Sequence, residues 1–228
     1  MKRFLLAAPA LFLLGCGAKV EQFVLPDQVT DFDALYASNC AGCHGHDGHF
    51  GPARRLNDPV FLAVIGKQNL RDVIANGVPR TGMPAFAQVA GGSLTDQQIA
   101  ILADQIEQKW SGPNNLTAVA LPPYRAELGD PKAGEVGFRK YCATCHGQDG
   151  TGGPKAGSVV YQAFLTLVSD QSLRSTVIVG CDDPGGGEKR NDVPVHGMAP
   201  QEISDVVAWL SAQRFTPVNL TQRGTKLQ

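Results

Sequence analysis

The sequence has little excess charge of either sign, and it lacks the patterns of a membrane-spanning or sheet-forming chain. Its 20 basic and 21 acidic side chains leave a formal net charge of −1. Nucleic-acid-binding domains usually carry a strongly basic face, so we expect no nucleic-acid partner. No apolar run reaches the roughly 20 residues of a membrane helix, and no long run alternates apolar with polar residues as a half-buried strand does. The 228 residues therefore predict a helical protein of one large or two small domains.

The longest apolar run, over residues 4–14, lies at the N-terminus and follows two basic residues. This order is typical of a secretory signal peptide. The tetrapeptide LLGC, which ends at Cys16, resembles the lipobox of bacterial lipoproteins, in which the cysteine becomes the acylated first residue. We expect export to the periplasmic or extracytoplasmic side of the membrane and anchoring there through an acylated Cys16. A plain signal peptide with an incidental cysteine is the alternative.

Two similar segments organise the rest of the chain. CAGCHGHDGHFGP begins at Cys40, and CATCHGQDGTGGP begins 102 positions later at Cys142. Downstream, FLAVIGKQNLRDVIANG (61–77) aligns without gaps to FLTLVSDQSLRSTVIVG (164–180). Each copy then ends in an amphipathic helical pattern, and proline and turn residues join the copies.

This repeat predicts two helical domains of similar plan, since neither copy shows the pattern of a sheet. The expected segments are a lipoprotein signal peptide over 1–15, a flexible tether over 16–30, a first domain over 31–110, a linker over 111–130, a second domain over 131–215 and a C-terminal tail over 216–228.

Each copy contains C-x-x-C-H, the attachment signature of c-type haem. The two thiols add to the haem vinyl groups, which fixes their spacing, and the adjacent histidine lies under the iron. A thioredoxin-like redox pair would need a βαβ context that the sequence lacks. A structural zinc site needs four ligands, and the second copy offers only three locally. We expect two haem c groups, covalently bound at Cys40, Cys43, Cys142 and Cys145.

A six-coordinate haem takes a second axial ligand, usually methionine or histidine. Of three methionines in the chain, Met1 leaves with the signal peptide. The other two fall one per repeat, each in a loop after the helix that contains the Leu-Arg pair. The expected iron ligands are His44 and Met83 in the first domain, and His146 and Met198 in the second.

This arrangement resembles class I cytochrome c, present twice in tandem over about residues 30–215. The resemblance implies an all-α fold, with each domain wrapped around one covalently attached haem, and one-electron transfer. It also implies that a backbone carbonyl in a proline segment orients each proximal histidine. Pro52 and Pro154 are the candidates for this role.

The family also crosses its terminal helices at a glycine that packs against an aromatic residue. The second copy offers Gly134 and Trp209 for this contact. The first copy has Phe32 and Gln105 at the aligned positions, so we expect a different crossing there, using Trp110.

Four further residues fall outside the shared frame. His46 and His49 have no histidine counterpart in the second copy, which favours a solvated loop over an adventitious metal site. His196 is either a polar neighbour of a haem propionate or a replacement for Met198 as ligand. Cys181 is an inert thiol, an intermolecular disulfide partner or a thiolate ligand.

The resemblance to cytochrome subunits of respiratory or photosynthetic assemblies implies an electron-transfer protein and not an enzyme. Its partners would be a quinol-oxidising, oxygen-reducing or photosynthetic membrane complex, or a soluble cytochrome. A free tethered shuttle and a fixed subunit both fit. The alternatives are a di-haem enzyme, such as a cytochrome c peroxidase or thiosulfate dehydrogenase, and a haem-based ligand sensor.

Overall fold

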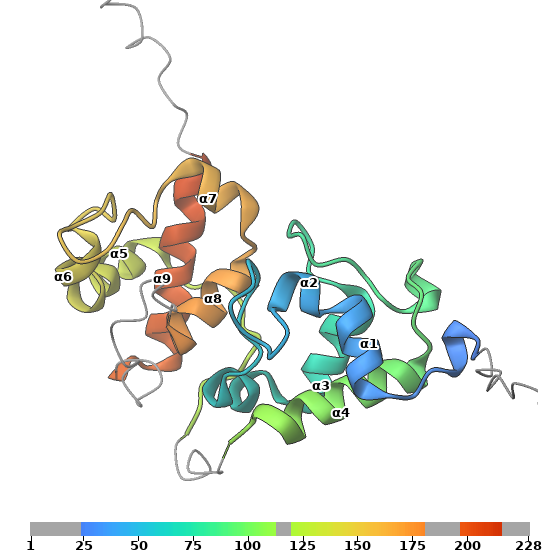
Figure 1. The fold of residues 1–228 in the computed structure, drawn as a ribbon. Coiled ribbons are helices and arrows are strands. Elements are labelled where there is room, and N and C mark those ends of the chain that lie inside the picture. Colours follow the sequence, from blue (N-terminus) through green and yellow to red (C-terminus); the bar gives the residue numbers. More distant parts are fainter. Residues whose placement is uncertain (1–23, 113–119, 181–196, 216–228) are drawn as a thin grey trace, which may run out of the picture.

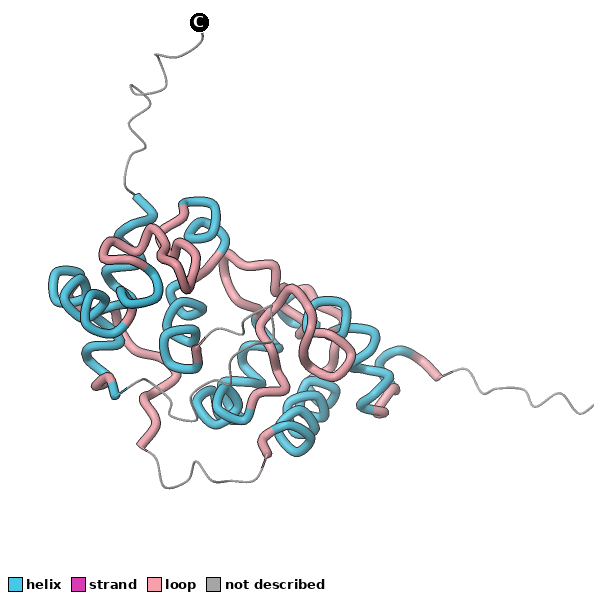
Figure 2. The backbone as a smooth tube through the Cα atoms, turned by 60° about the vertical axis from the view of Figure 1, so that its left-hand side comes forward, coloured by secondary structure: helices cyan, strands magenta, loops and turns pink. Residues whose placement is uncertain are grey.

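The structure is a computed structural model that describes residues 24–112, 120–180 and 197–215 (Figure 1). These residues form helices and loops, as the backbone tube in Figure 2 shows, with one isolated bridge between Ala87 and Leu94. The predicted all-α fold is confirmed. Several predicted features lie outside the described residues: the signal peptide, Cys16, Cys181, His196 and the tail over 216–228.

The first unit, residues 24–112, contains the helices α1 (Phe32–Asn39), α2 (Ala41–His44), α3 (Pro59–Asn76) and α4 (Asp96–Trp110). Both α1 and α3 pack against α4. Thr95 caps the start of α4, because its hydroxyl accepts from the Gln98 amide while the Gln98 side chain accepts from the Thr95 amide. This reciprocal pair satisfies two amides that a helix start leaves without partners.

Gln98 also holds the segment that precedes the first unit. Its side-chain amide donates to the carbonyls of Pro26 and Val29 at 2.7 and 3.0 Å, and Gln98 itself is buried. The sequence had assigned these residues to a flexible tether over 16–30. Residues 26–29 are instead fixed to α4, so any free tether is shorter than predicted.

The second unit spans residues 131–180 and 197–215. It contains α5 (Pro131–Tyr141), α6 (Ala143–His146), α7 (Gln162–Leu167), α8 (Asp170–Val179) and α9 (Pro200–Ala212). The long α9 lies at its centre, with α5 and α8 packed against it (Figure 1). Pro200 begins α9, as expected of a residue whose missing amide costs nothing in a first helical turn.

The middle helix of each unit is interrupted at the same aligned position. In the first unit α3 bends at Gly66, whose φ of 64° lies in the left-handed region that glycine adopts without strain. In the second unit the aligned residue is Ser169, and its hydroxyl caps the start of α8 by accepting from the Ser172 amide. Glycine and serine thus break the helix by different means at one place.

The predicted glycine–tryptophan crossing is present in the second unit. A Cβ atom added at Gly134 would lie 1.9 Å from the carbonyl oxygen of Asp205 and 2.9 Å from Cβ of Trp209. Only glycine lets α5 and α9 approach this closely. The Trp209 ring stacks at a tilt on Phe138, with 4.4 Å between ring centres.

The first unit fills the equivalent space from another helical position, as expected. The Trp110 ring packs edge-on against Tyr36 and Phe32, at 5.3 and 6.3 Å between centres. Its outer edge reaches Gly48, and the outer edge of Trp209 reaches the aligned Gly150. Two tryptophans from different helix registers therefore pack on the same glycine of the loop that follows C-x-x-C-H.

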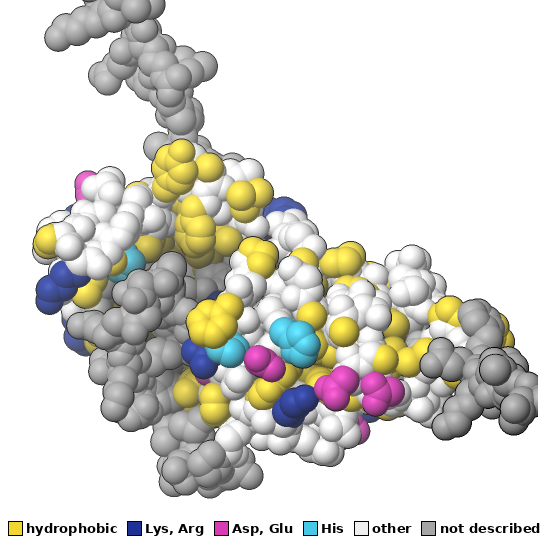
Figure 3. Space-filling view, in the orientation of Figure 1, with side chains coloured by type: hydrophobic (Ala, Val, Ile, Leu, Met, Phe, Trp, Pro, Cys, Tyr) yellow, Lys and Arg dark blue, Asp and Glu magenta, His cyan; other side chains and the backbone are white. Residues whose placement is uncertain are grey.

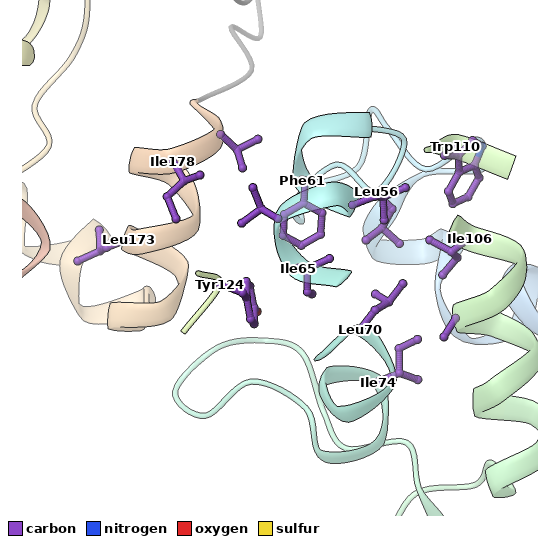
Figure 4. Close-up of a cluster of buried hydrophobic side chains, with 14 of the residues drawn as sticks. Leu56, Phe61, Ile65, Leu70, Ile74, Ile106, Trp110, Tyr124, Leu173 and Ile178 are labelled. Carbon is purple, nitrogen blue, oxygen red and sulfur yellow. The ribbon is translucent and has the colours of Figure 1, made fainter. Parts of the chain in front are cut away.

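The two units share one buried apolar cluster. Figure 4 shows Phe61 and Ile65 of α3 facing Ile178 of α8, with Tyr124 of the connecting segment between the units. Tyr124 is 6% exposed. The second part of the predicted linker is thus packed into the interface.

Candidate functional site

The C-x-x-C-H segments form the same tight turn in both units. Each first cysteine ends one helix and precedes a single helical turn, α2 or α6. The His44 amide donates to the Cys40 carbonyl at 2.9 Å, and the His146 amide donates to the Cys142 carbonyl at 3.0 Å. This turn brings both thiols and the histidine of each motif to one short stretch of helix.

The four motif cysteines are free thiols. Cys40 is half-buried and Cys43 is exposed, so the pair lies at the edge of the core and not deep within it. Burial raises the pKa of Cys40 and of Cys142 to about 11, with a contribution from the neighbouring cysteine of each pair. The thiols of Cys40 and Cys142 are therefore protonated at neutral pH, in contrast to the thiolates of reactive redox pairs.

A backbone carbonyl holds each motif histidine. Nδ1 of His44 donates to the carbonyl of Arg54 at 2.6 Å, and Nδ1 of His146 donates to the carbonyl of Gly157 at 2.9 Å. The expectation of a carbonyl partner is met, but the assignment to Pro52 and Pro154 is wrong by two and three residues.

The path of each loop explains the displaced partner. After Pro52 the Ala53 amide donates back to the Cys43 carbonyl. This contact brings the loop to the motif, where the Arg54 carbonyl meets the His44 imidazole. The preceding Gly51 passes so close to the motif that an added Cβ would lie 2.1 Å from the Cys43 oxygen. Pro52 itself is exposed, and the hydrogen bond from His44 goes to the Arg54 carbonyl two residues later.

The carbonyl contact leaves Nε2 of each imidazole as the nitrogen that can bind a metal. Burial lowers the pKa of His44, and the hydrogen bond to Arg54 opposes this only in part, so the ring is neutral at physiological pH. A neutral imidazole with one nitrogen fixed by a carbonyl is the arrangement of a metal-ligating histidine. The two thiols one turn earlier supply the covalent attachment that a c-type haem requires, so the residues fit that group.

The two predicted methionine ligands lie in loops at the edge of the core. Met83 is half-buried, its amide donates to the Thr81 hydroxyl, and its carbonyl accepts from Val78. Met198 follows Gly197 directly before α9 and is 5% exposed. Both side chains pack against the shared apolar cluster, as a thioether facing a buried cofactor would.

His46 and His49 lie in a solvated loop, as expected. The His46 side chain is 93% exposed, and His49 stacks on the exposed Phe50 ring. On the face drawn in Figure 3, histidine, acidic and apolar side chains are mixed, without a large patch of one charge. Over the described ranges no three His, Cys, Asp or Glu side chains meet as a metal-binding group.

Arg54 and Gly157 are the residues of these sites that sequence reasoning missed. They lie 10 and 11 positions after their histidines, because the second loop is one residue longer. Any non-terminal residue has a carbonyl, so residue type carries no signal for this contact. Only the folded path of the loop identifies it.

Two family descriptions match the chain, one on each unit. Residues 27–105 match cytochrome C oxidase, cbb3-type, subunit III, and residues 131–213 match cytochrome c. In the part of the chain that the structure describes, no helix is long and apolar enough to cross a bilayer.

Individual proteins show the same likeness. The Cbb3-type cytochrome c oxidase subunit CcoP of Rubrivivax gelatinosus is 30% identical over 135 residues, which cover 58% of this chain and 38% of that protein. The c-type cytochrome KustC0563 is 26% identical, with a TM-score of 0.30 over 34% of this chain and 95% of its own. The reducing HAO-like protein complex Kustc0457/Kustc0458 of Kuenenia stuttgartiensis is 16% identical, with a TM-score of 0.42. The match covers 84% of this chain and 99% of that one.

Proposed function

The chain consists of two cytochrome c domains in tandem, and we propose that it is a di-haem electron carrier that relays single electrons between a membrane redox complex and an acceptor. Two haem c groups are its cofactors, and each supplies an iron that alternates between Fe(III) and Fe(II). The observation that carries the proposal is the C-x-x-C-H turn, present twice with the same backbone hydrogen bonds and a carbonyl-held histidine.

In the first domain, Cys40 and Cys43 hold the haem by thioether bonds, and His44 binds the iron through Nε2. The Arg54 carbonyl keeps the imidazole in the required tautomer and orientation. Met83 would also bind the iron, and its thioether would stabilise the ferrous state and raise the potential.

In the second domain, Cys142 and Cys145 would hold the haem covalently, and His146 and Met198 would bind its iron. The Met198 side chain is buried, and this supports a closed ligand position without access for a substrate. Saturated ligation in both domains favours outer-sphere electron transfer over catalysis, so we assign no catalytic residue.

The proposed partner is an oxygen-reducing membrane complex. The curated relative is a subunit of a cbb3-type cytochrome c oxidase, and the match to its family falls on the first domain. The present chain spans about two fifths of that relative, and its own N-terminus carries a lipobox-like sequence. We propose that acylation of Cys16 holds the two domains at the periplasmic membrane surface, as a subunit or dedicated partner of such a complex.

A redox titration of the purified protein tests the assignment. We expect two haems per chain by pyridine haemochrome assay, and a near-infrared methionine–iron band from each oxidised haem. Met83→Ala and Met198→Ala form a matched pair, because each should remove the band of one haem and lower its potential while the other haem is unchanged. A wild-type protein that lacks both bands would contradict methionine ligation.

Carbon monoxide distinguishes a carrier from the other functional classes. The reduced wild-type protein should bind little carbon monoxide at neutral pH, whereas each methionine variant should bind it at one haem. Stoichiometric binding by the wild type would instead indicate an open coordination site, as in a di-haem peroxidase or a ligand sensor.

A further inference from the structure

Arg54 takes part in two contacts that belong to different domains. Its carbonyl accepts the hydrogen bond from Nδ1 of His44 at 2.6 Å. Its guanidinium donates through Nη2 to the hydroxyl of Thr176 on α8, at 2.5 Å. One residue therefore connects the proximal histidine of the first domain to a helix of the second, across 122 positions of sequence.

The surroundings of the guanidinium fix its orientation. It lies over the ring of Phe61 on α3, with 5.3 Å from its central carbon to the ring centre. It is also close enough to Tyr124 to lower the pKa of that phenol, although burial raises it by more. Three elements thus contact a half-buried arginine, where a charge-assisted hydrogen bond is stronger than in water.

The described residues of the second domain show no equivalent connection. Nδ1 of His146 donates to the carbonyl of Gly157, which has no side chain and lies in an exposed loop. The proximal hydrogen bond is also longer there, at 2.9 Å against 2.6 Å in the first domain. The asymmetry is a specific difference between two otherwise repeated sites.

We propose that Arg54 is a positioning residue through which the second domain sets the strength of the proximal His44 hydrogen bond, and with it the potential of the first haem. This inference rests on the proposed haem ligation. A stronger Nδ1–H···O=C bond makes the imidazole a better electron donor. Donation stabilises Fe(III), so loosening Arg54 should raise the potential of the first haem and leave the second unchanged.

Thr176→Val removes the hydroxyl of the second domain that accepts from Arg54, and it changes no residue of the first domain. Thr176→Ser keeps the hydroxyl and should restore wild-type behaviour. Arg54→Met removes the guanidinium but keeps the backbone carbonyl, so the effect of Thr176→Val should disappear in that background. Thr166→Val is the matched control, because the exposed Thr166 hydroxyl donates to the Gln162 carbonyl within α7 itself.

The measurement is hydrogen exchange of the His44 and His146 ring N–H protons in the reduced, diamagnetic holoprotein, together with both potentials. For Thr176→Val we expect His44 exchange to be on the order of threefold faster, which corresponds to part of one hydrogen bond. The potential of the first haem should rise, while the His146 proton and the second potential stay at wild-type values.

Two results would overturn the inference: an unchanged His44 proton in folded Thr176→Val, or equal changes at both histidines, which would indicate general loosening. Haem content of the same samples separates this inference from the proposed function. Two attached haems with an unchanged His44 proton refute the coupling alone. Fewer than two haems in the wild type refute the proposed function and the inference with it.

Discussion

The contact of α5 with α9 gives a sharp test of how the second domain is packed. Gly134→Ala adds a Cβ atom that would lie 1.9 Å from the Asp205 carbonyl oxygen and 2.5 Å from its carbon. These atoms belong to the backbone of a buried helix and cannot rotate away, so the two helices must separate. Overpacking of this kind lowers the free energy of unfolding by about 1–3 kcal/mol, and occasionally by more.

Gly137→Ala on the same helix is the matched control. Its added Cβ would meet only Cγ2 of Val206, at 3.0 Å, and a side-chain methyl can shift slightly. Both substitutions gain about 1 kcal/mol of helix propensity, so this contribution cancels when the two variants are compared. We expect Gly134→Ala to be less stable than wild type by about 2 kcal/mol, and Gly137→Ala to be at or slightly above wild type.

Guanidinium and thermal unfolding of the holoprotein measure the difference. For a domain of this size, about 2 kcal/mol corresponds to a Tm lower by roughly 8–16 °C. The second domain should unfold first in Gly134→Ala, with loss of its methionine–iron band before that of the first domain. Equal midpoints for the two alanine variants would refute the idea that this crossing requires glycine.

Two further predictions concern backbone strain and acid stability. Phe50 is 95% exposed and has a φ of 66°, a left-handed conformation that strains a residue with a side chain, and the second domain has a glycine at the aligned position. Phe50→Gly should therefore leave the free energy of unfolding unchanged or raise it by up to about 1 kcal/mol. A clear loss of stability in this variant would contradict backbone strain at Phe50. Burial alone would raise the pKa of Asp170, but hydrogen bonds from Arg214 and Ser211 outweigh it and lower the pKa. The stability from this carboxylate is present above its ordinary pKa of about 3.9 and is lost as the pH falls through the lowered value. Asp170→Asn should therefore lose less stability than wild type between pH 5 and about 2 in unfolding titrations, and parallel curves would count against the assignment.

Features that depend on short segments could be predicted from the sequence. The C-x-x-C-H turn needs only five residues, and it has the same hydrogen bonds in both copies. The glycine–tryptophan crossing was also predictable, because the resemblance to class I cytochrome c implies this contact and Gly134 and Trp209 stand at the positions for it. The use of Trp110 in the first domain followed from the absence of that pair.

Features that depend on the meeting of the two domains could not be predicted. Phe61 and Phe164 occupy the same position of the repeat, yet Phe61 is 5% exposed and Phe164 is 40% exposed. Both begin a Phe-Leu pair at the same point of the repeat, so the position in the pattern does not distinguish them. The difference arises because α3 packs toward Tyr124 and α8 at the interface. The choice of Arg54 over Pro52 as the histidine partner likewise depends on the folded path of a loop.

The packed connecting segment changes where the chain can be cut. Arg174 on α8 is 3% exposed, and its guanidinium donates to the Pro123 carbonyl at 2.9 and 3.2 Å and to the Ser204 hydroxyl at 3.1 Å. A fragment that starts at Pro131 would remove the Pro123 acceptor and leave part of a buried cation without its partner, at a cost of about 1–3 kcal/mol. A gene fragment for the second domain should therefore begin ahead of Leu121 to keep the Pro123 acceptor in place.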